Sequence, residues 1–184
     1  CIGSRSQKGL PYCSSVCCMY ATKEAVLIKE HSPECDVHIF YIDMRAFGKG
    51  FQEFITRAKN EWHVKYVEGH PGRVVESPKT NDLQIQYEDT IDGGMKSIVV
   101  DLVVLCPALI PRRSNQKLAK ILNIELDEYG FFRSKDPLFS PIDTRTSGVF
   151  ICGYCQGPKD IPDSVAQASG AAARAAETIA LASQ

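Results

Sequence analysis

The sequence lacks a marked excess of either charge. Its 184 residues carry 21 lysines and arginines against 22 aspartates and glutamates, which gives a net charge of −1. This balance provides no electrostatic basis for binding nucleic acid or an anionic membrane. The sequence also lacks an apolar run near the roughly 20 residues that a helix needs to span a bilayer, and it shows no secretory signal pattern. We therefore expect neither nucleic acid binding nor membrane insertion.

Histidines are few, and cysteines are not. The four histidines are scattered, and no pair has the spacing of metal ligands. Eight cysteines without a secretory signal indicate a reducing compartment and a use in metal or redox chemistry, so we expect a cytoplasmic protein. The length and a hydrophobic content of 44% suffice for one large domain or two small ones. Because the chain opens on Cys1, we interpret it as a piece of a longer polypeptide.

Half of the cysteines lie within the first eighteen residues, as Cys1, Cys13, Cys17 and Cys18. Ser14 or Ser15 can cap a helix, which places Cys17 and Cys18 in its first turn. Free backbone N–H groups and the positive end of the helix dipole stabilise negative charge there. Four thiolates around an iron–sulfur cube carry such charge, and four cysteines are the usual complement of a 4Fe-4S cluster.

Two other uses of these cysteines stay open. Zinc also accepts four cysteines, although structural zinc sites favour two Cys-x2-4-Cys pairs, which this stretch lacks. The cysteines can also be structural or redox-active thiols. Disulfides suit the sequence less, because the chain is large enough for a core and neighbouring cysteines pair only under strain. The spacing Cys-x11-Cys-x3-Cys-Cys matches neither the bacterial nor the plant ferredoxin pattern.

Alternating helix and strand patterns in the first half predict an α/β fold. We expect a doubly wound, Rossmann-like parallel sheet with right-handed crossovers, followed by a β-meander. The expected parallel part consists of a helix over 15–29, a strand over 37–42, a helix over 50–62 and a strand over 64–67. After a turn at 69–72, the expected meander has strands over 73–76, 83–87 and 97–105, with a hairpin signal at Asp92-Gly93-Gly94.

The second half predicts a smaller lobe. Pro107 and Pro111 mark the crossing into it, so we expect one domain over 1–108 and another over 109–184. The elements expected there are a helix over 114–122, a strand or tight turn over 126–132, a strand over 148–152 and a helix from Asp163 or Ser164 to Ala182.

The first lobe lacks the means to hold a nicotinamide nucleotide. At the first strand-to-helix turn, where a dinucleotide-binding fold keeps its Gly-x-Gly-x-x-Gly loop, Gly3 and Gly9 do not have that spacing. Asp43 stands where an acidic residue would bind the ribose. Without a phosphate loop before it, we interpret Asp43 as a polar residue at a strand end.

Two patterns near the C-terminus carry possible chemistry. Residues 148–153 followed by a helix form a strand–turn–helix whose N-terminus can face a phosphate or an electron-rich ring, although a packed strand and helix explain the pattern equally well. Cys152 and Cys155 form a Cys-x-x-Cys that a redox dithiol would use, but Cys152 falls on the apolar strand.

Four stretches together resemble the A-type subunit of heterodisulfide reductase, the iron–sulfur flavoprotein of that complex in methanogens. These stretches are 1–5, 11–21, 40–50 and 157–169, and the likeness extends over nearly the whole chain. The resemblance implies a thioredoxin-reductase-like core, in which an FAD domain is interrupted by a nicotinamide-type domain. It also implies that the 4Fe-4S cluster lies in the latter domain, with Cys1, Cys13, Cys17 and Cys18 as its ligands.

The same resemblance assigns residues 109–184 to the C-terminal half of the FAD domain. It implies FAD contacts from the following residues: Gly148, Gly153, Tyr154, Asp160, Asp163, Ser164, Val165 and Ala166. The wider family usually has Asp after the last glycine, where this sequence has Tyr154, and Asp160 or Asp163 can substitute. The N-terminal half of the FAD domain, with its glycine fingerprint, is absent from these residues, so we expect the piece alone to be inactive.

The function implied by the resemblance is electron transfer between FAD and iron–sulfur clusters, in heterodisulfide reduction or a related electron-bifurcating complex. The implied partners are the other subunits of such a complex, and a homodimer also stays open. Two alternatives come from the residues themselves. One is a zinc-stabilised structural or docking module, and the other is a pyridine-nucleotide disulfide oxidoreductase that uses Cys152 and Cys155.

Overall fold

The computed structural model describes residues 2–183, which form two compact units. The first unit contains the segment up to Leu10 together with Cys17–Pro107. The second contains Pro11–Val16 and the chain from Ala108 onward. The short segment Pro11–Val16 therefore belongs to the second unit, although both of its sequence neighbours belong to the first.

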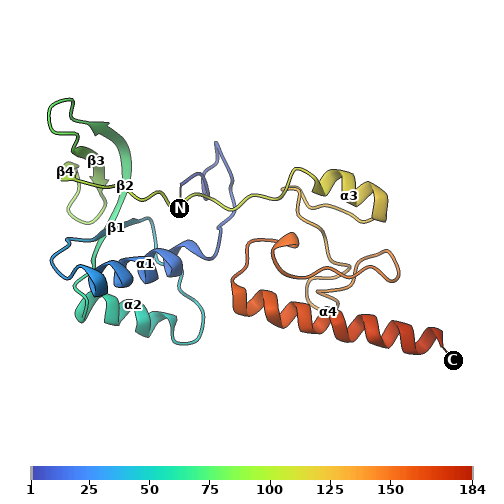
Figure 1. Cartoon of the computed structure of the whole chain (residues 1–184). Helices are drawn as coiled ribbons and strands as arrows, with labels where there is room; N and C mark the ends of the chain where they lie inside the picture. Colours follow the sequence, from blue (N-terminus) through green and yellow to red (C-terminus); the bar gives the residue numbers. More distant parts are fainter. Residues whose placement is uncertain (1, 184) are drawn as a thin grey trace. The chain divides into compact units, whose positions relative to one another are not determined.

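A four-stranded mixed sheet organises the first unit (Figure 1). Its strands follow the chain order: β1 (His38–Tyr41), β2 (Lys65–Glu76), β3 (Leu83–Asp89) and β4 (Met95–Val100). β1 pairs with β2 in parallel, from His38 opposite Lys65 to Tyr41 opposite Glu68, and the other two pairs are antiparallel. The α/β prediction is confirmed, and the sheet is compatible with a Rossmann-like fold. Within residues 2–183, however, the parallel part extends over a single strand pair, which is less than the expected doubly wound sheet.

Strand β2 corrects the expected turn at 69–72. The sequence suggests two short strands around Gly69-His-Pro-Gly72, but the backbone continues as one strand of 12 residues. Its first four residues pair with β1 on one edge, and the others, except Gly72, pair with β3 on the other. Pro71 cannot donate a ladder hydrogen bond, and a register shift between Pro71 and Arg73 accommodates it. Gly69 is required because a Cβ atom there would collide with the Glu88 carbonyl oxygen.

The expected hairpin between β3 and β4 is confirmed. Gly93 and Gly94 both have positive φ, at 76° and 89°, and the Asp89 N–H donates to the Gly94 carbonyl at 3.1 Å. Asp89 and Asp92 each pair with Lys96, which closes the turn. These contacts fix the register that places Ile85 opposite Ile98.

Two helices, α1 (Cys17–His31) and α2 (Phe51–Asn60), lie side by side in the first unit (Figure 1). Ala25 and Val26 of α1 pack with Ala58 of α2 and with Val64, and Ala58 is fully buried. Both helices were expected, but α1 begins two residues later than predicted. The expected cap by Ser14 is wrong, since its hydroxyl accepts a hydrogen bond from the Leu109 N–H at 2.9 Å.

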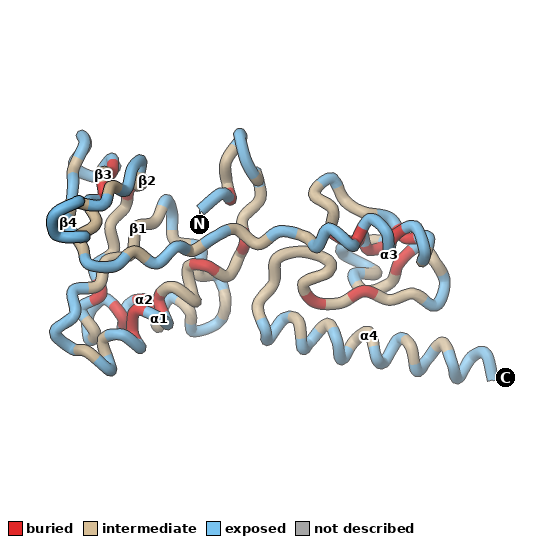
Figure 2. The backbone as a smooth tube through the Cα atoms, turned by 45° about the horizontal axis from the view of Figure 1, so that its top comes forward, coloured by how far each residue is buried: buried red, intermediate tan, exposed pale blue. Residues whose placement is uncertain are grey.

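The described part of the second unit contains two α-helices and much irregular chain. α3 (Asn115–Leu122) and α4 (Ile161–Ala182) flank a 3-10 turn, η1 (Gly153–Cys155). The hydrophobic core of the second unit includes a cluster of Ala119, Ile124, Phe132 and Ile151. None of the described residues of α4 is buried, and the helix is pale blue and tan along its length in Figure 2. No helix among residues 2–183 combines the length and apolar content needed to cross a bilayer.

The strand expected over 148–152 is not formed. Phe150 makes a single bridge with Asp143, and the Ile151 N–H donates to the Ile142 carbonyl at 2.9 Å. A tight turn competes with a longer ladder, because the Val149 N–H donates back to the Thr146 carbonyl at 3.2 Å. Thr144 also turns its hydroxyl onto the Val149 carbonyl at 2.8 Å. The expected tight turn over 126–132 is present, closed by the bridge between Leu126 and Phe132.

Candidate functional site

Cys17 and Cys18 open helix α1, as the sequence predicts. Cys17 is 5% exposed, and Cys18 is half-buried. The Arg45 backbone N–H donates to the Cys18 sulfur at 3.5 Å. A hydrogen bond from Cys17 lowers the pKa of Cys18 to about 6, against the opposing effect of burial and with help from the Arg45 N–H. The start of α1 therefore stabilises a thiolate at neutral pH.

Cys13 is held by a separately anchored turn of the second unit. The Ser15 N–H donates to the Cys13 sulfur at 3.3 Å, and Ser15 has a left-handed φ of 62°. On either side of Cys13, the Tyr12 hydroxyl donates to the Leu109 carbonyl at 2.8 Å and Ser14 accepts from the Leu109 N–H. The Tyr12 ring also packs against the rings of Tyr129 and Phe131. The backbone around Cys13 is thus fixed at two points.

Cys1, the fourth candidate ligand, lies outside the described residues. Among residues 2–183, no three Cys, His, Asp or Glu side chains converge closely enough to hold a metal ion. The assignment of all four cysteines to one cluster stays a prediction. The donor chemistry nonetheless suits iron–sulfur ligation, because Cys13 and Cys18 each accept a backbone N–H.

Asp43 is engaged by two arginines of its own unit. Arg5 pairs with one carboxylate oxygen, and the Arg45 Nε lies 3.3 Å from the other. Burial raises the pKa of Asp43, but hydrogen bonding from Arg45 and the charges of both arginines outweigh it, and the pKa falls below its usual value. Asp43 therefore carries a firmly ionised carboxylate at the end of β1. The sequence identifies it as a strand-end polar residue, but the two arginines were missed.

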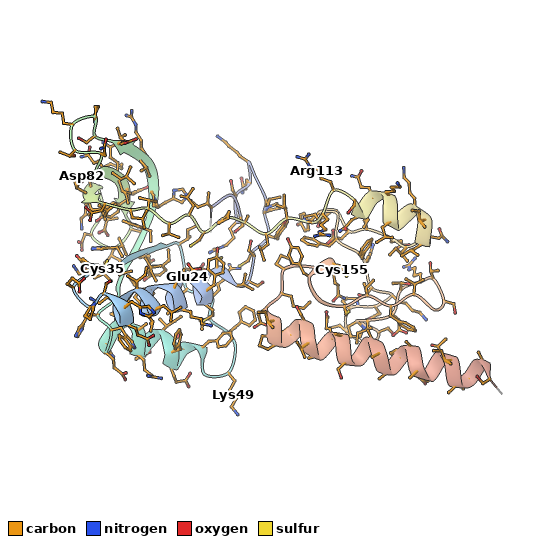
Figure 3. The ribbon with its side chains drawn as sticks, in the orientation of Figure 1. Glu24, Cys35, Lys49, Asp82, Arg113 and Cys155 are labelled. Atoms are coloured by element: carbon orange, nitrogen blue, oxygen red, sulfur yellow. The ribbon has the colours of Figure 1, made fainter. Side chains whose placement is uncertain are left out.

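Cys106 is a further thiol of the first unit near α1. The Tyr20 side chain forms a hydrogen bond with Cys106. The pKa of Tyr20 is raised, mainly by burial and to a smaller extent by its interaction with Cys106. The Cys106 carbonyl accepts the Ile2 N–H at 2.8 Å. Spacing in the sequence offers no signal for this neighbour, because Tyr20 and Cys106 are 86 positions apart. Cys35, labelled in Figure 3, is instead exposed in the loop between α1 and β1.

The expected FAD residues fall into one close group and several separate positions. Gly153 has a φ of 66°, and a Cβ atom there would touch the Cβ of Ser164 at 3.4 Å. Asp160 caps α4 by accepting the Asp163 N–H at 2.8 Å, and it also accepts the Ser164 hydroxyl through its carbonyl at 2.6 Å. The expected start of α4 at Asp163 or Ser164 is therefore corrected to Ile161, because Asp160 is the cap.

The remaining expected FAD residues do not join this group. Gly148 is exposed with a φ of 76°, and Val165 and Ala166 are exposed on α4. The Tyr154 hydroxyl donates to the Ile110 carbonyl. Sequence reasoning missed Gln167, whose side-chain oxygen accepts the Gly153 N–H at 2.7 Å, and Gln156, which accepts from Gln167 at 2.7 Å. This pair of amides ties the Gly153 turn to α4.

Of the expected Cys-x-x-Cys pair, Cys155 does not have the chemistry of an activated thiol. The Cys155 thiol, labelled in Figure 3, donates to the Cys152 carbonyl at 3.1 Å. Burial raises the pKa of Cys155. A thiol that attacks disulfides needs a stabilised thiolate instead.

Comparison with known proteins identifies close relatives over almost the whole chain. The chain is 49% identical over 173 residues to the iron-sulfur subunit of CoB–CoM heterodisulfide reductase from Methanocaldococcus jannaschii, covering 94% of this chain and 26% of that protein. It is 47% identical over 177 residues to the corresponding H(2)/formate:CoB-CoM heterodisulfide,ferredoxin reductase subunit from Methanococcus maripaludis, covering 96% and 27%. An Archaeoglobus profundus protein named for its likeness to the heterodisulfide reductase subunit is 43% identical over 180 residues, covering 98% and 25%.

The chain spans about a quarter of the length of these curated relatives. No protein-family model matches it. The resemblance expected from the four sequence stretches is confirmed, as is the expectation that the likeness is to a fragment.

Proposed function

We propose that this chain is the part of an oxidoreductase subunit that carries a 4Fe-4S cluster and half of an FAD site. The premise is that the chain is homologous to a segment of the A-type iron–sulfur subunit of heterodisulfide reductase. The whole protein would relay electrons between FAD and iron–sulfur clusters, in reduction of the CoB-S-S-CoM heterodisulfide or in a related electron-bifurcating complex. The names of the relatives include the words iron-sulfur and heterodisulfide, which supports this class of chemistry.

One observation carries the proposal: adjacent cysteines at a helix start, one of them with a strongly lowered pKa. Cys18 receives hydrogen bonds from Cys17 and from the Arg45 backbone. Iron binds thiolates and not thiols. The hydrogen bond from Cys17 is lost once Cys17 is itself a bound thiolate, whereas the Arg45 N–H can still stabilise the ionised Cys18 that iron needs. The proposed ligands are Cys1, Cys13, Cys17 and Cys18. A 4Fe-4S cluster bound by them would supply one-electron transfer.

The proposed flavin contacts centre on the start of α4. Gly153, Asp160, Asp163 and Ser164 form the close group there, and a helix N-terminus suits an electron-rich ring or a phosphate. Gln167 already occupies the Gly153 N–H, and the Gly153 carbonyl accepts the Gln156 N–H at 3.1 Å. In this proposal the contact of that glycine therefore comes from its Cα. Gly148, Tyr154, Val165 and Ala166 complete the proposed set.

The proposed partners are the other subunits of a heterodisulfide reductase-type complex. The relatives are named as subunits, which supports a multi-subunit setting. We further propose that the division into a nicotinamide-type domain over 1–108 and an FAD half-domain over 109–184 follows that of the full-length relatives.

Anaerobic reconstitution with iron and sulfide tests the proposal. The chain and its Cys17→Ser variant are reconstituted, and iron and sulfide content are measured with the EPR spectrum after reduction. We expect about four irons per chain and the EPR signal of a cubane cluster. In Cys17→Ser this signal should be lost or strongly altered. Cys35→Ser is the matched control, because Cys35 is an exposed loop cysteine, and it should leave the signal intact. A colourless protein that retains one zinc instead would contradict the proposal and favour the zinc module.

A further inference from the structure

The loop that follows β1 delivers a backbone donor to a proposed cluster ligand. The chain leaves β1 after Tyr41, and three residues after Ile42 the Arg45 N–H points to the Cys18 sulfur at 3.5 Å. Backbone N–H donors to cysteine sulfur are among the interactions that set the potential of an iron–sulfur cluster, because they stabilise its more negative, reduced state. The position of this N–H therefore matters to any cluster that Cys18 holds.

Asp43 holds the loop that carries this N–H donor. Its two carboxylate oxygens are divided between two arginines. One is Arg5, in the N-terminal segment before α1, and the other is Arg45, whose backbone supplies the N–H. The Arg5 side chain is only 19% exposed, and its backbone has a left-handed φ of 57°. A charge-assisted pair with a partly buried arginine holds a loop more firmly than an exposed pair does. Asp43 thus joins three points of the chain that all belong to the first unit.

We propose that Asp43 is a positioning residue for the cluster: by pairing with Arg5 and Arg45 it holds the Arg45 N–H on the Cys18 sulfur and so raises the reduction potential of the cluster. This inference rests on the proposed function. It assigns a role to an acidic residue that, in a nucleotide-binding relative of this fold, would face a ribose.

The sign of the effect separates positioning from simple electrostatics. A carboxylate near the cluster disfavours its reduced state, so loss of the Asp43 charge alone would raise the potential. Loss of the N–H donor would lower it. Removing the Asp43 side chain removes its charge and also releases the N–H donor. The effect of the charge should be small, because the Asp43 carboxylate is half-exposed and paired with two arginines. The positioning role therefore predicts that loss of the donor prevails and that the potential falls.

The test compares Asp43→Ala, Asp43→Glu and the control Asp36→Ala. Asp36 is also a carboxylate of the first unit paired with a basic side chain, Lys65, and its hydrogen bonds go to Lys65 and His38 rather than to the α1 cysteines. The midpoint potential is measured by redox titration of the reconstituted chain with EPR detection. Hydrogen exchange of the Arg45 amide is measured separately in the reduced, metal-free chain.

The expected result is a lower midpoint potential and faster Arg45 exchange in Asp43→Ala, with partial recovery of both in Asp43→Glu and no change in Asp36→Ala. An unchanged or higher potential in Asp43→Ala, or an Arg45 amide that stays protected, overturns the inference. If the wild-type chain takes up no iron, the proposed function fails, and the exchange measurement still decides whether Asp43 holds the donor. If only Asp43→Ala fails to take up the cluster, the exchange measurement decides in the same way.

Discussion

The ionisation of Cys18 gives the sharpest test of the site. In the reduced, metal-free chain, its pKa of about 6 leaves roughly 90% thiolate at pH 7, whereas a thiol at the ordinary value of 9.0 has about 1%. A less basic thiolate is also a weaker nucleophile, and with a Brønsted slope near about 0.45 the roughly three-unit difference costs about 20-fold in intrinsic rate. We therefore expect iodoacetamide to modify Cys18 only about 4-fold faster than an ordinary thiol at pH 7.

The pH profile is more decisive than the rate itself. The alkylation rate of Cys18, followed by peptide mass spectrometry between pH 5 and pH 9, should reach half of its plateau near pH 6. Cys17→Ala removes the hydrogen bond that contributes most to the low pKa, so its midpoint should move to higher pH. A wild-type midpoint near pH 9, or one that Cys17→Ala leaves in place, would refute the reasoning about this helix start.

Three further substitutions test the fold by urea unfolding. Gly69→Ala should lower the free energy of unfolding by about 1–3 kcal/mol, because its methyl group meets the Glu88 carbonyl. The control Gly72→Ala should lower it far less, because the nearest atom to its methyl group is 3.9 Å away. Equal losses of stability in the two variants would contradict the close approach at Gly69. Asp160→Ala should cost about 1 kcal/mol through loss of the α4 cap, and an unchanged stability would show that the cap is not used. Phe131→Ala, at a side chain 2% exposed, should cost about 3–5 kcal/mol, and a loss below about 1 kcal/mol would contradict its burial.

Local patterns in the sequence predicted local structure well. The apolar spacing from Phe51 to Trp62 predicted α2 with only small errors at its ends, and Asp92-Gly93-Gly94 predicted the hairpin between β3 and β4. The placement of Cys17 and Cys18 in a first helical turn also follows from neighbours in sequence. Each of these signals depends on residues within one turn or one strand, where periodicity and turn chemistry act directly.

Features that depend on distant partners were not predictable in this way. Gly69, Pro71 and Gly72 have the composition of a turn, but Gly69 and Pro71 pair with β3, and Gly72 lies at the register shift between Pro71 and Arg73. The pairs of Asp43 with Arg5 and of Tyr20 with Cys106 join residues 38 and 86 positions apart, and no local pattern marks them. Side-chain capping is equally ambiguous in sequence: Asp160, Asp163 and Ser164 are all suitable, and the backbone geometry selects Asp160.

Strand β2 is a single backbone shared by two kinds of pairing, with no loop between Lys65–Glu68 and the residues that pair with β3. A displacement of the β3–β4 hairpin therefore either moves β2 together with its parallel pairing to β1, or breaks hydrogen bonds of the β2–β3 ladder. The outer edge of the sheet at β4 is in this way mechanically linked to the end of β1, a few residues before the arginine amide that reaches Cys18.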